Sequence, residues 1–294
     1  MSQNTVSQNK DLFHAYQIGV IGITVMSTVP VAIKWISSDP WVIGFIRLLI
    51  ATTAMYFLRP AIRQAKALSL KDYYMLAALG LCFGLHWIAY FFSIKLGTAT
   101  IAVISTISAY GLFISVAGRY FLRHPIKPYH WFALLLGVIG TLLVGGEFDL
   151  NSHALIGFVL GIISGCFYGA LPILHQKSTH LSGDVRTFGQ FAGAFVLFIF
   201  CVPLGNWQFA EHDWIGLLYL GLVGTVLAHS LWVYAATNLP TTASGVLKYM
   251  YIPLTATISY FTLGETLTPM QIVGCVIVIS GCVLGVTGER LFKS

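Results

Sequence analysis

The feature that most constrains the fold of this chain is an apolar segment that occurs twice. One copy starts at Pro128 and continues through Gly140, and the other starts at Pro269 and continues through Gly281. The matched residues are 141 positions apart in a chain of 294 residues. An offset of nearly half the chain length indicates that one structural unit is present in two copies.

The low charge content indicates which solvent surrounds this unit. The chain is 57% hydrophobic and only 9% charged, whereas soluble domains carry about 25% charged residues. Because so few charges cannot cover a surface that faces water, we predict a multi-pass protein of the cell (inner or plasma) membrane, with the lipid bilayer as its solvent. The formal charge of +6 is scattered through short loops, so no nucleic-acid partner is expected. The five cysteines lie in apolar runs without a CxxC pair, which indicates no metal site, and no cofactor is expected.

Apolar runs of about 20 residues predict ten membrane-spanning helices and an all-α polytopic fold. Five spans form a first repeat at residues 15–146, and five form a second repeat at residues 153–288. Tails at residues 1–14 and 289–294 flank the two repeats. The predicted spans are roughly 15–35, 41–59, 72–93, 98–118, 129–146, 153–175, 187–204, 213–235, 241–262 and 269–288.

Loop charges predict the orientation of the spans. With a cytoplasmic N-terminus, 12 of the 16 lysine and arginine residues lie on the cytoplasmic side and two on the outer side. The positive-inside rule favours this arrangement, with both termini cytoplasmic. Because each repeat has an odd number of spans, the two repeats cross the membrane in opposite senses. Pro30 with Pro172, and Gly80 with Gly221, match at offsets of 142 and 141, so we predict an inverted repeat.

The last two spans contain a recognisable series of residues. They are Ala243-Ser244, Pro253, Leu263-Gly264-Glu265, Leu267-Thr268, Gln271, Gly274 and Gly281. This pattern, together with Phe45-Ile46-Arg47 in the second span, resembles the EamA-type members of the drug/metabolite transporter superfamily, and the resemblance extends over nearly the whole chain. The resemblance implies ten helices in two inverted halves, a central substrate cavity, and the movement of small metabolites, notably amino acids, out of the cell.

The two copies differ within this pattern. Gly264-Glu265 in the second copy aligns with Arg123-His124 in the first, so the acidic position is present only once. Glu265 lies shortly before the last span and is expected to cap that helix, because a helix N-terminus favours negative charge. Direct contact with a substrate is the alternative role for this carboxylate.

Lys248 is the residue that most directly suggests a binding site. It lies seven positions past Thr241, which is about 10 Å into the ninth span. A charge at this depth costs at least about 2.5–3.5 kcal/mol unless it meets a partner or a wet cavity. All ten acidic residues fall at span ends, in loops or in tails. Lys248 therefore either snorkels to the cytoplasmic interface or contacts an anionic group of a substrate.

Three further polar side chains are predicted within the spans. Arg47 lies near the outer end of the second span, where it can serve the structure or face a cavity. His86 and His229 lie in the middle of the third and eighth spans. A neutral histidine bonded to a hydroxyl is the simpler interpretation of each, and proton coupling is the alternative, because histidine changes charge near neutral pH.

Aromatic side chains gather in the spans that would line a cavity, and they suit a compact amphipathic solute. Prolines interrupt several spans and can kink them. The predicted substrate-binding residues are Lys248, Trp87, Tyr90, Tyr110, Trp232, Tyr249, His86 and His229. The predicted hinge or structural residues are Pro30, Pro172, Pro253, Gly264, Glu265 and Arg47.

These features predict a secondary active transporter that moves a small-molecule substrate by alternating access. The resemblance implies export of an amino acid or related amphipathic solute, and Lys248 favours a substrate with a negative group. A channel or facilitator is the alternative. An intramembrane enzyme is disfavoured, because the sequence has no HExxH, no GxSxG and no pair of intramembrane carboxylates. A monomer and a homodimer both stay open.

Overall fold

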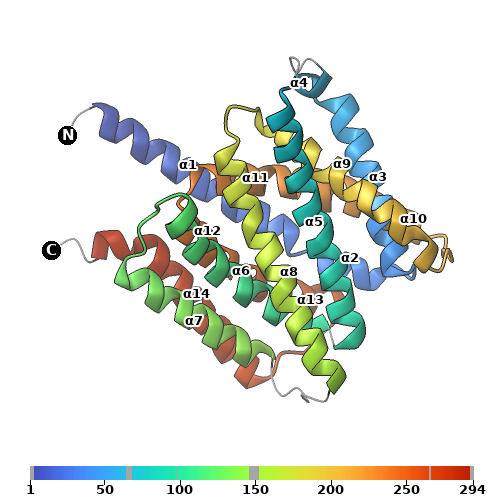
Figure 1. Ribbon diagram of the computed structural model, residues 1–294. Coiled ribbons are helices and arrows are strands. Elements are labelled where there is room, and N and C mark those ends of the chain that lie inside the picture. Colours follow the sequence, from blue (N-terminus) through green and yellow to red (C-terminus); the bar gives the residue numbers. More distant parts are fainter. Residues whose placement is uncertain (1–2, 64–67, 98, 146–151, 265, 292–294) are drawn as a thin grey trace.

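The computed structural model describes residues 3–63, 68–97, 99–145, 152–264 and 266–291, and every regular element in these ranges is a helix (Figure 1). The first repeat contains α1 (Gln3–Met26), α2 (Val29–Trp35), α3 (Pro40–Leu58), α4 (Pro60–Arg63), α5 (Leu70–Leu96), α6 (Ala99–Phe121) and α7 (Pro128–Gly145). The second contains α8 (Ser152–Lys177), α9 (Gly183–Cys201), the 3-10 turn η1 (Val202–Leu204), α10 (Asp213–Gly221), the π-helical turn η2 (Leu222–Leu227), α11 (Ala228–Asn238), α12 (Thr241–Lys248), α13 (Tyr251–Leu263) and α14 (Pro269–Leu291).

The helices confirm the predicted class, an all-α multi-pass membrane protein. Nine segments of the described chain are long and apolar enough to cross a membrane. The remaining predicted span, the ninth, at 241–262, is occupied by two shorter helices, α12 and α13. At the N-terminus, α1 already begins at Gln3, so part of the predicted tail is helical. A hydropathy pattern does not detect such a start, because these residues are polar but compatible with a helix.

The packing of the helices follows a pseudo-two-fold arrangement. In Figure 1, α7 and α14 lie side by side along one part of the bundle, and α3 packs against α9 elsewhere. These pairs join the fifth span to the tenth and the second span to the seventh, so each helix meets its own counterpart. The contact of α5 with α8 is likewise repeated by that of α11 with α1. The structure thus has the two inverted repeats that the duplicated sequence predicts.

Two spans are broken in the middle of the protein. The first span stops at Met26 and resumes at Val29, and the ninth stops at Lys248 and resumes at Tyr251. A proline follows each break within the first turn of the next helix, at Pro30 and Pro253. Proline has no amide hydrogen to donate to the preceding turn, so neither helix can continue through the break with a full set of hydrogen bonds. Pro172, by contrast, lies inside the continuous helix α8.

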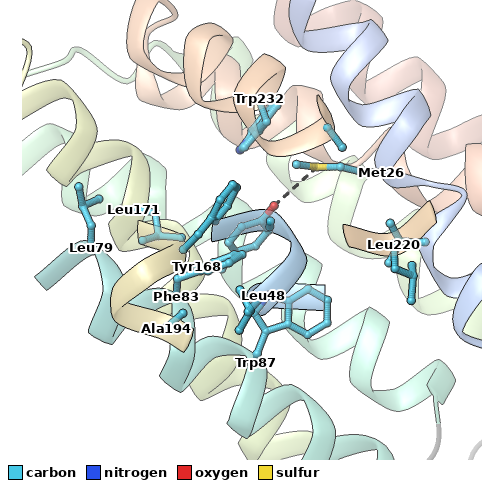
Figure 2. Packing of buried hydrophobic residues seen from close by; sticks show 14 of the residues in the cluster. Met26, Leu48, Leu79, Phe83, Trp87, Tyr168, Leu171, Ala194, Leu220 and Trp232 are labelled. Carbon is cyan, nitrogen blue, oxygen red and sulfur yellow. Dashed lines mark hydrogen bonds between the residues drawn. The ribbon is translucent and has the colours of Figure 1, made fainter. Parts of the chain in front are cut away.

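The two breaks lie against each other. The Ser27 hydroxyl donates to the carbonyl of Tyr251 over 3.4 Å, and the Thr255 hydroxyl donates to the carbonyl of Ser27 over 3.3 Å. Around them, buried side chains from α1, α3, α5, α8, α9 and α11 form the larger of two apolar clusters (Figure 2). The interior of an otherwise apolar bundle therefore contains polar contacts between the ends of the interrupted helices.

Candidate functional site

A cavity of about 230 Å³ lies beside the paired breaks. Its volume falls below the range of about 300–1,000 Å³ typical of drug-sized ligands, so it suits a small metabolite. Segments from both repeats form its wall. The lining residues are Met26, Val29, Pro30, Ile33, Lys34, Arg47, His86, Trp87, Tyr90, Ile94, Val103, Thr106, Ile107, Tyr168, Gly224, His229, Lys248 and Tyr251.

Lys248 is the central cation of this wall, and its side chain is 1% exposed. Its Nζ atom lies 2.9 Å from the hydroxyl of Tyr168 and 3.0 Å from the sulfur of Met26. The same atom lies 4.4 Å from the ring centroid of Trp232, 4.9 Å from that of Tyr168 and 5.8 Å from that of Tyr251. Aromatic faces attract an ammonium group through their negative quadrupole. This cage, rather than the membrane interface, is where the structure places the lysine.

The helix break contributes to the environment of Lys248. The lysine is the last residue of α12, and a cation in the last turn of a helix interacts favourably with the helix dipole. None of the 18 lining residues is Asp or Glu, so the dipole and the aromatic rings take the place of a carboxylate partner.

Arg47 is a second buried cation on the cavity wall, also 1% exposed. Its Nε donates to the hydroxyl of Thr225 over 3.0 Å, and its Nη2 lies 3.5 Å from the carbonyl of Gly224. Both partners belong to the π-helical turn η2, in which the Thr225 hydroxyl bonds to the carbonyl of Leu220, five residues earlier. The guanidinium also stacks over Trp87, with Cζ 4.2 Å from the ring centroid.

The histidines lie on the same wall, at its deep end. His86 Nδ1 is 2.8 Å from the hydroxyl of Ser164, and that hydroxyl donates to the carbonyl of His86 over 3.0 Å. The His86 ring stacks on Tyr168 with centroids 4.4 Å apart. His229 meets the ring of Phe83 edge-on, with centroids 4.9 Å apart. A continuous series of contacts thus joins Ser164, His86, Tyr168 and Lys248.

The structure gathers most of the predicted site residues but not all. Lys248, Trp87, Tyr90, His86 and His229 line the cavity, and so do Pro30 and Arg47 from the structural set. Trp232 contacts Lys248 from behind the wall, and Tyr110 lies behind Tyr168 with centroids 5.0 Å apart. Glu265 lies outside the described residues.

Tyr249 is placed away from the cavity. Its side chain belongs to the second apolar cluster, with Ala133, Leu134 and Val278, and its hydroxyl donates to the carbonyl of Ser108 over 3.3 Å. Tyr249 and Lys248 point to different sides, as adjacent residues of a helix do, because each residue turns the helix by about 100°.

Sequence analysis missed Met26 and Tyr168, the two side chains closest to the Lys248 ammonium. A signal for them does exist. Each lies four residues before a matched proline, Met26 before Pro30 and Tyr168 before Pro172, so the two are counterparts at the same offset of 142. Their side chains also meet, with the Tyr168 hydroxyl 3.7 Å from the Met26 sulfur (Figure 2). The pseudo-symmetry axis therefore brings these positions together.

The cavity reaches the exposed Lys34 near the end of α2 and is closed at its other end. Next to Tyr168 and His229, on the side of His175, lies a small void of about 10 Å³. Beyond it, His175 Nε2 meets Gln190 Oε1 at 2.7 Å, Arg186 donates to the carbonyl of His175, and Gln176 donates to the carbonyl of Ala236 over 2.7 Å. These bonds join α8, α9 and α11 across the closed end.

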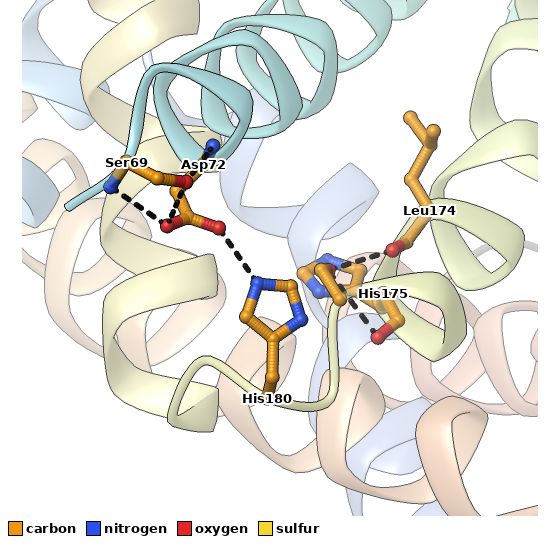
Figure 3. A network of polar contacts seen from close by, with 6 residues as sticks. Ser69, Asp72, Leu174, His175 and His180 are labelled. Carbon is orange, nitrogen blue, oxygen red and sulfur yellow. Dashed lines mark hydrogen bonds and ion pairs between the residues drawn. The ribbon is translucent and has the colours of Figure 1, made fainter.

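A second polar cluster ties the surface of this end together (Figure 3). The Ser69 hydroxyl and the Asp72 carboxylate form a capping box at the start of α5. The same carboxylate lies 2.6 Å from Nε2 of His180, in the turn between α8 and α9. The first repeat is thereby joined to the second at the closed end, while the opposite end holds the cavity mouth.

Comparisons with known proteins agree with this architecture. The chain matches the EamA-like transporter family at residues 15–146 and again at residues 155–287. It is 26% identical to an uncharacterized transporter of Archaeoglobus fulgidus over 259 residues, which cover 84% of this chain and 87% of that protein. It is 30% identical to the threonine/homoserine exporter RhtA of Escherichia coli (strain K12) over 178 residues, 57% of this chain and 59% of the exporter. A protein crystal structure superposes with a TM-score of 0.83 at 17% identity, covering 96% of this chain and 99% of that one, which shows a shared fold.

Proposed function

Because the chain belongs to the EamA-like transporter family, we propose that it exports a small carboxylate-bearing metabolite of the amino-acid class by alternating access. The observation that carries this proposal is Lys248, a buried cation on a cavity wall that has no Asp or Glu among its described lining residues. A carboxylate that enters the cavity would supply the missing counter-charge. Buried charges persist in proteins when they are paired, so the cation favours a solute that pairs with it.

Alternating access follows from the two ends of the site. With both termini cytoplasmic, as the loop charges predict, the cavity mouth at Lys34 faces the outside and the bonded end at His175 and Arg186 faces the cytoplasm. The structure then represents an outward-open state. Opening the bonded end while the mouth closes would expose the same lysine to the cytoplasm, and the inverted repeats supply the two equivalent arrangements that such an exchange needs.

The relatives support the solute class. One relative is named as an exporter of threonine and homoserine, and both compounds carry a carboxylate. The walls at Tyr90 and Trp87 offer flat apolar surface with polar edges, which suits the remainder of an amphipathic solute. Lys248 is expected to bind the carboxylate, and the hydroxyls of Tyr168 and Tyr251 to complete its hydrogen bonds.

Counterflow into proteoliposomes tests the proposal. The purified protein, loaded with a panel of unlabelled amino acids, should accelerate uptake of a labelled amino acid in a saturable manner. Lys248→Gln should reduce this flux at least about tenfold, because the substitution deletes a charged hydrogen bond worth more than about 1.4 kcal/mol. Lys95→Gln, which changes an exposed lysine near the end of α5, is the matched control and should keep the flux. Equal flux in both variants contradicts the assigned role, and a steady ionic conductance would indicate the alternative, a channel.

Proton coupling is a second part of the proposal. His86 and His229 are the titratable groups that share the cavity wall with Arg47, Lys248 and the tyrosines. Through Tyr168, His86 is in contact with the group that holds Lys248. His86→Gln with His229→Gln should flatten the pH dependence of counterflow between about pH 6 and pH 8, where histidine usually titrates. An unchanged pH profile in the double variant would assign both histidines to structure alone.

A further inference from the structure

Arg47 has unused capacity to bind an anion. Its Nε and Nη2 atoms are engaged by η2, but Nη1 has no hydrogen-bond partner among the described residues. The side chain lines the cavity while it is almost fully buried. A guanidinium presents its donors in a rigid fork that matches a carboxylate. A buried donor without a partner is costly, so this atom points to a ligand that completes it.

Arg47 and Lys248 also share the absence of a counter-ion. Neither forms an ion pair within the part of the chain that the structure describes, where the pairs are Arg59 with Asp184 and two contacts of histidine with aspartate. The cavity wall thus carries two buried cations and, among its described residues, no carboxylate. Like charges confined in one apolar site are stabilised by an anion bound between them.

An α-ammonium group would find no carboxylate among the described lining residues of this cavity. Its usual partners are a carboxylate, which the lining lacks, and the face of an aromatic ring. The ring of Trp87 already receives Arg47, and the rings of Tyr168, Tyr251 and Trp232 already receive Lys248. The protein's own cations therefore occupy these faces, and a third positive charge would be repelled by both.

From these observations we propose that Arg47 and Lys248 form a two-point carboxylate site that reads the anionic end of the solute and does not require its ammonium group. The inference rests on the proposed function and narrows it to carboxylates whose net charge is negative, such as 2-hydroxy acids and acidic amino acids, in preference to zwitterions. Arg47 acts here as a binding residue, in addition to its contacts with Thr225 and Gly224.

Competition in the counterflow assay tests the inference with three compounds on one carbon skeleton. They are the amino acid that gives the strongest counterflow, its 2-hydroxy analogue, which keeps the carboxylate and loses the ammonium, and its methyl ester, which keeps the ammonium and loses the carboxylate charge. At a pH of about 7.5 the hydroxy acid should compete at least as well as the amino acid, because only its anionic end is read. The ester should be at least about tenfold weaker.

The outcomes separate the two proposals. If the amino acid competes tenfold or more better than its hydroxy analogue, the ammonium is recognised and the inference is overturned, while the proposed function stands. If the ester competes as well as the amino acid, or if no carboxylate gives counterflow, the carboxylate role of the site fails and the proposed function fails with it.

Variants of Arg47 provide an independent measurement. Arg47→Gln should weaken competition by the hydroxy acid tenfold or more and should bring the hydroxy acid and the amino acid closer together in affinity. Arg47→Lys, which keeps the charge and loses the fork, should fall between Arg47→Gln and the unchanged protein. Arg47→Gln also removes a positive charge that repels the ammonium group of the amino acid, whereas a purely structural role through η2 would weaken both compounds by the same factor. An unchanged ratio in folded Arg47→Gln protein therefore overturns the assignment.

Discussion

The fourth span, α6, and the ninth span, α12 with α13, hold equivalent places in the two repeats, yet only α6 is continuous. At an offset of 141, Lys248 corresponds to Ile107, and both residues line the cavity. The continuous helix presents an apolar wall there, whereas the broken one presents a cation at a helix terminus. Tyr249 crosses between them and bonds to the carbonyl of Ser108, its own counterpart. The two equivalent spans thus both form the cavity wall, and the difference between them places a cation on one side of it.

The most severe test of this comparison exchanges the cation and the apolar side chain between the two equivalent positions. Ile107→Lys places a cation at a buried position of a continuous helix, where no helix terminus supports it. An unpaired buried charge costs about 3–5 kcal/mol, so the variant should lose most of its thermal stability in detergent. Ile107→Met is the size-matched control and should lose less than about 1.5 kcal/mol.

Lys248→Met makes the converse change. Removing a buried charge in favour of an apolar side chain is often neutral or stabilising, so this variant should melt no lower than the unchanged protein while counterflow is lost. If Ile107→Lys proved as stable as Ile107→Met, the break in the ninth span would not be what allows a cation there.

The packing of the Tyr249 ring against two glycines provides the second test. An added Cβ at Gly137 would lie 2.7 Å from the Tyr249 ring, and one at Gly111 would lie 2.6 Å from it. Overpacking of this kind costs about 1–3 kcal/mol, so Gly137→Ala should lower the melting temperature and displace the turn that holds Lys248. Gly183→Ala is the control, because the nearest atom to its added Cβ is 3.9 Å away, on the flexible side chain of Arg186. Combining Gly137→Ala with Tyr249→Ala should give less than the sum of the two losses.

The residues that follow the two spans give a smaller effect. Gly264 after α13 has φ of 67°, and its counterpart Arg123 after α6 has φ of 58°. The backbone is therefore alike at the position where glycine is exchanged for arginine. A side chain in this conformation costs about 1–2 kcal/mol, so Gly264→Ala should destabilise the protein by about 1 kcal/mol, because no atom lies within 4 Å of the added Cβ. Arg123→Gly should stabilise it by about 1 kcal/mol or less. The melting temperatures of both variants test this prediction. A shift of the same sign in both variants would contradict it.

His124, the counterpart of Glu265, gives the smallest effect. The amide of Thr241 at the start of α12 donates to His124 Nδ1 over 3.2 Å, so this contact needs a neutral ring. Burial lowers the pKa of His124 from its ordinary value of 6.5. Its contribution to stability is therefore present above about pH 6.5 and is lost as the pH falls toward the lowered folded-state pKa. His124→Asn keeps an acceptor without the titration, and its melting temperature should change less between about pH 7.5 and pH 5 than that of the unchanged protein. Identical pH profiles would exclude this contact as a source of acid sensitivity.

Much of the fold follows from the sequence because the two repeats share residues at a constant offset. The matched prolines and glycines predict two inverted halves, and the apolar runs predict where the spans lie. The break at Tyr249 and Met250 was not predicted, because the apolar pattern continues through it and Pro253 indicates only a kink. Whether a helix bends or stops at a proline depends on what neighbouring segments offer to its free carbonyls, which is tertiary information.

The candidate site is less accessible to sequence reasoning, for a related reason. Depth along a span can be counted, so Lys248, His86 and His229 were expected inside the membrane, and all three line the cavity. Adjacent residues of a helix point about 100° apart, so Tyr249 and Lys248 do not share one face, and the structure separates them. Arg47 was assigned to structure because the π-helical turn that positions it leaves no signal in hydropathy. Met26 and Tyr168 become visible only when the two halves are superposed on their prolines.

The polarity of α12 also has a consequence for biosynthesis. The segment from Thr241 to Leu263 is not among the described stretches that are apolar and continuous enough to cross a membrane alone, and its lysine adds about 2.5–3.5 kcal/mol to the cost of insertion. Chains emerge from the ribosome N-terminus first, and Met26, Tyr168 and Trp232 all precede Lys248. By the time the lysine leaves the ribosome, three of the groups that will surround it have already been made. The order of synthesis thus allows the earlier helices to surround this less apolar span as it enters the membrane.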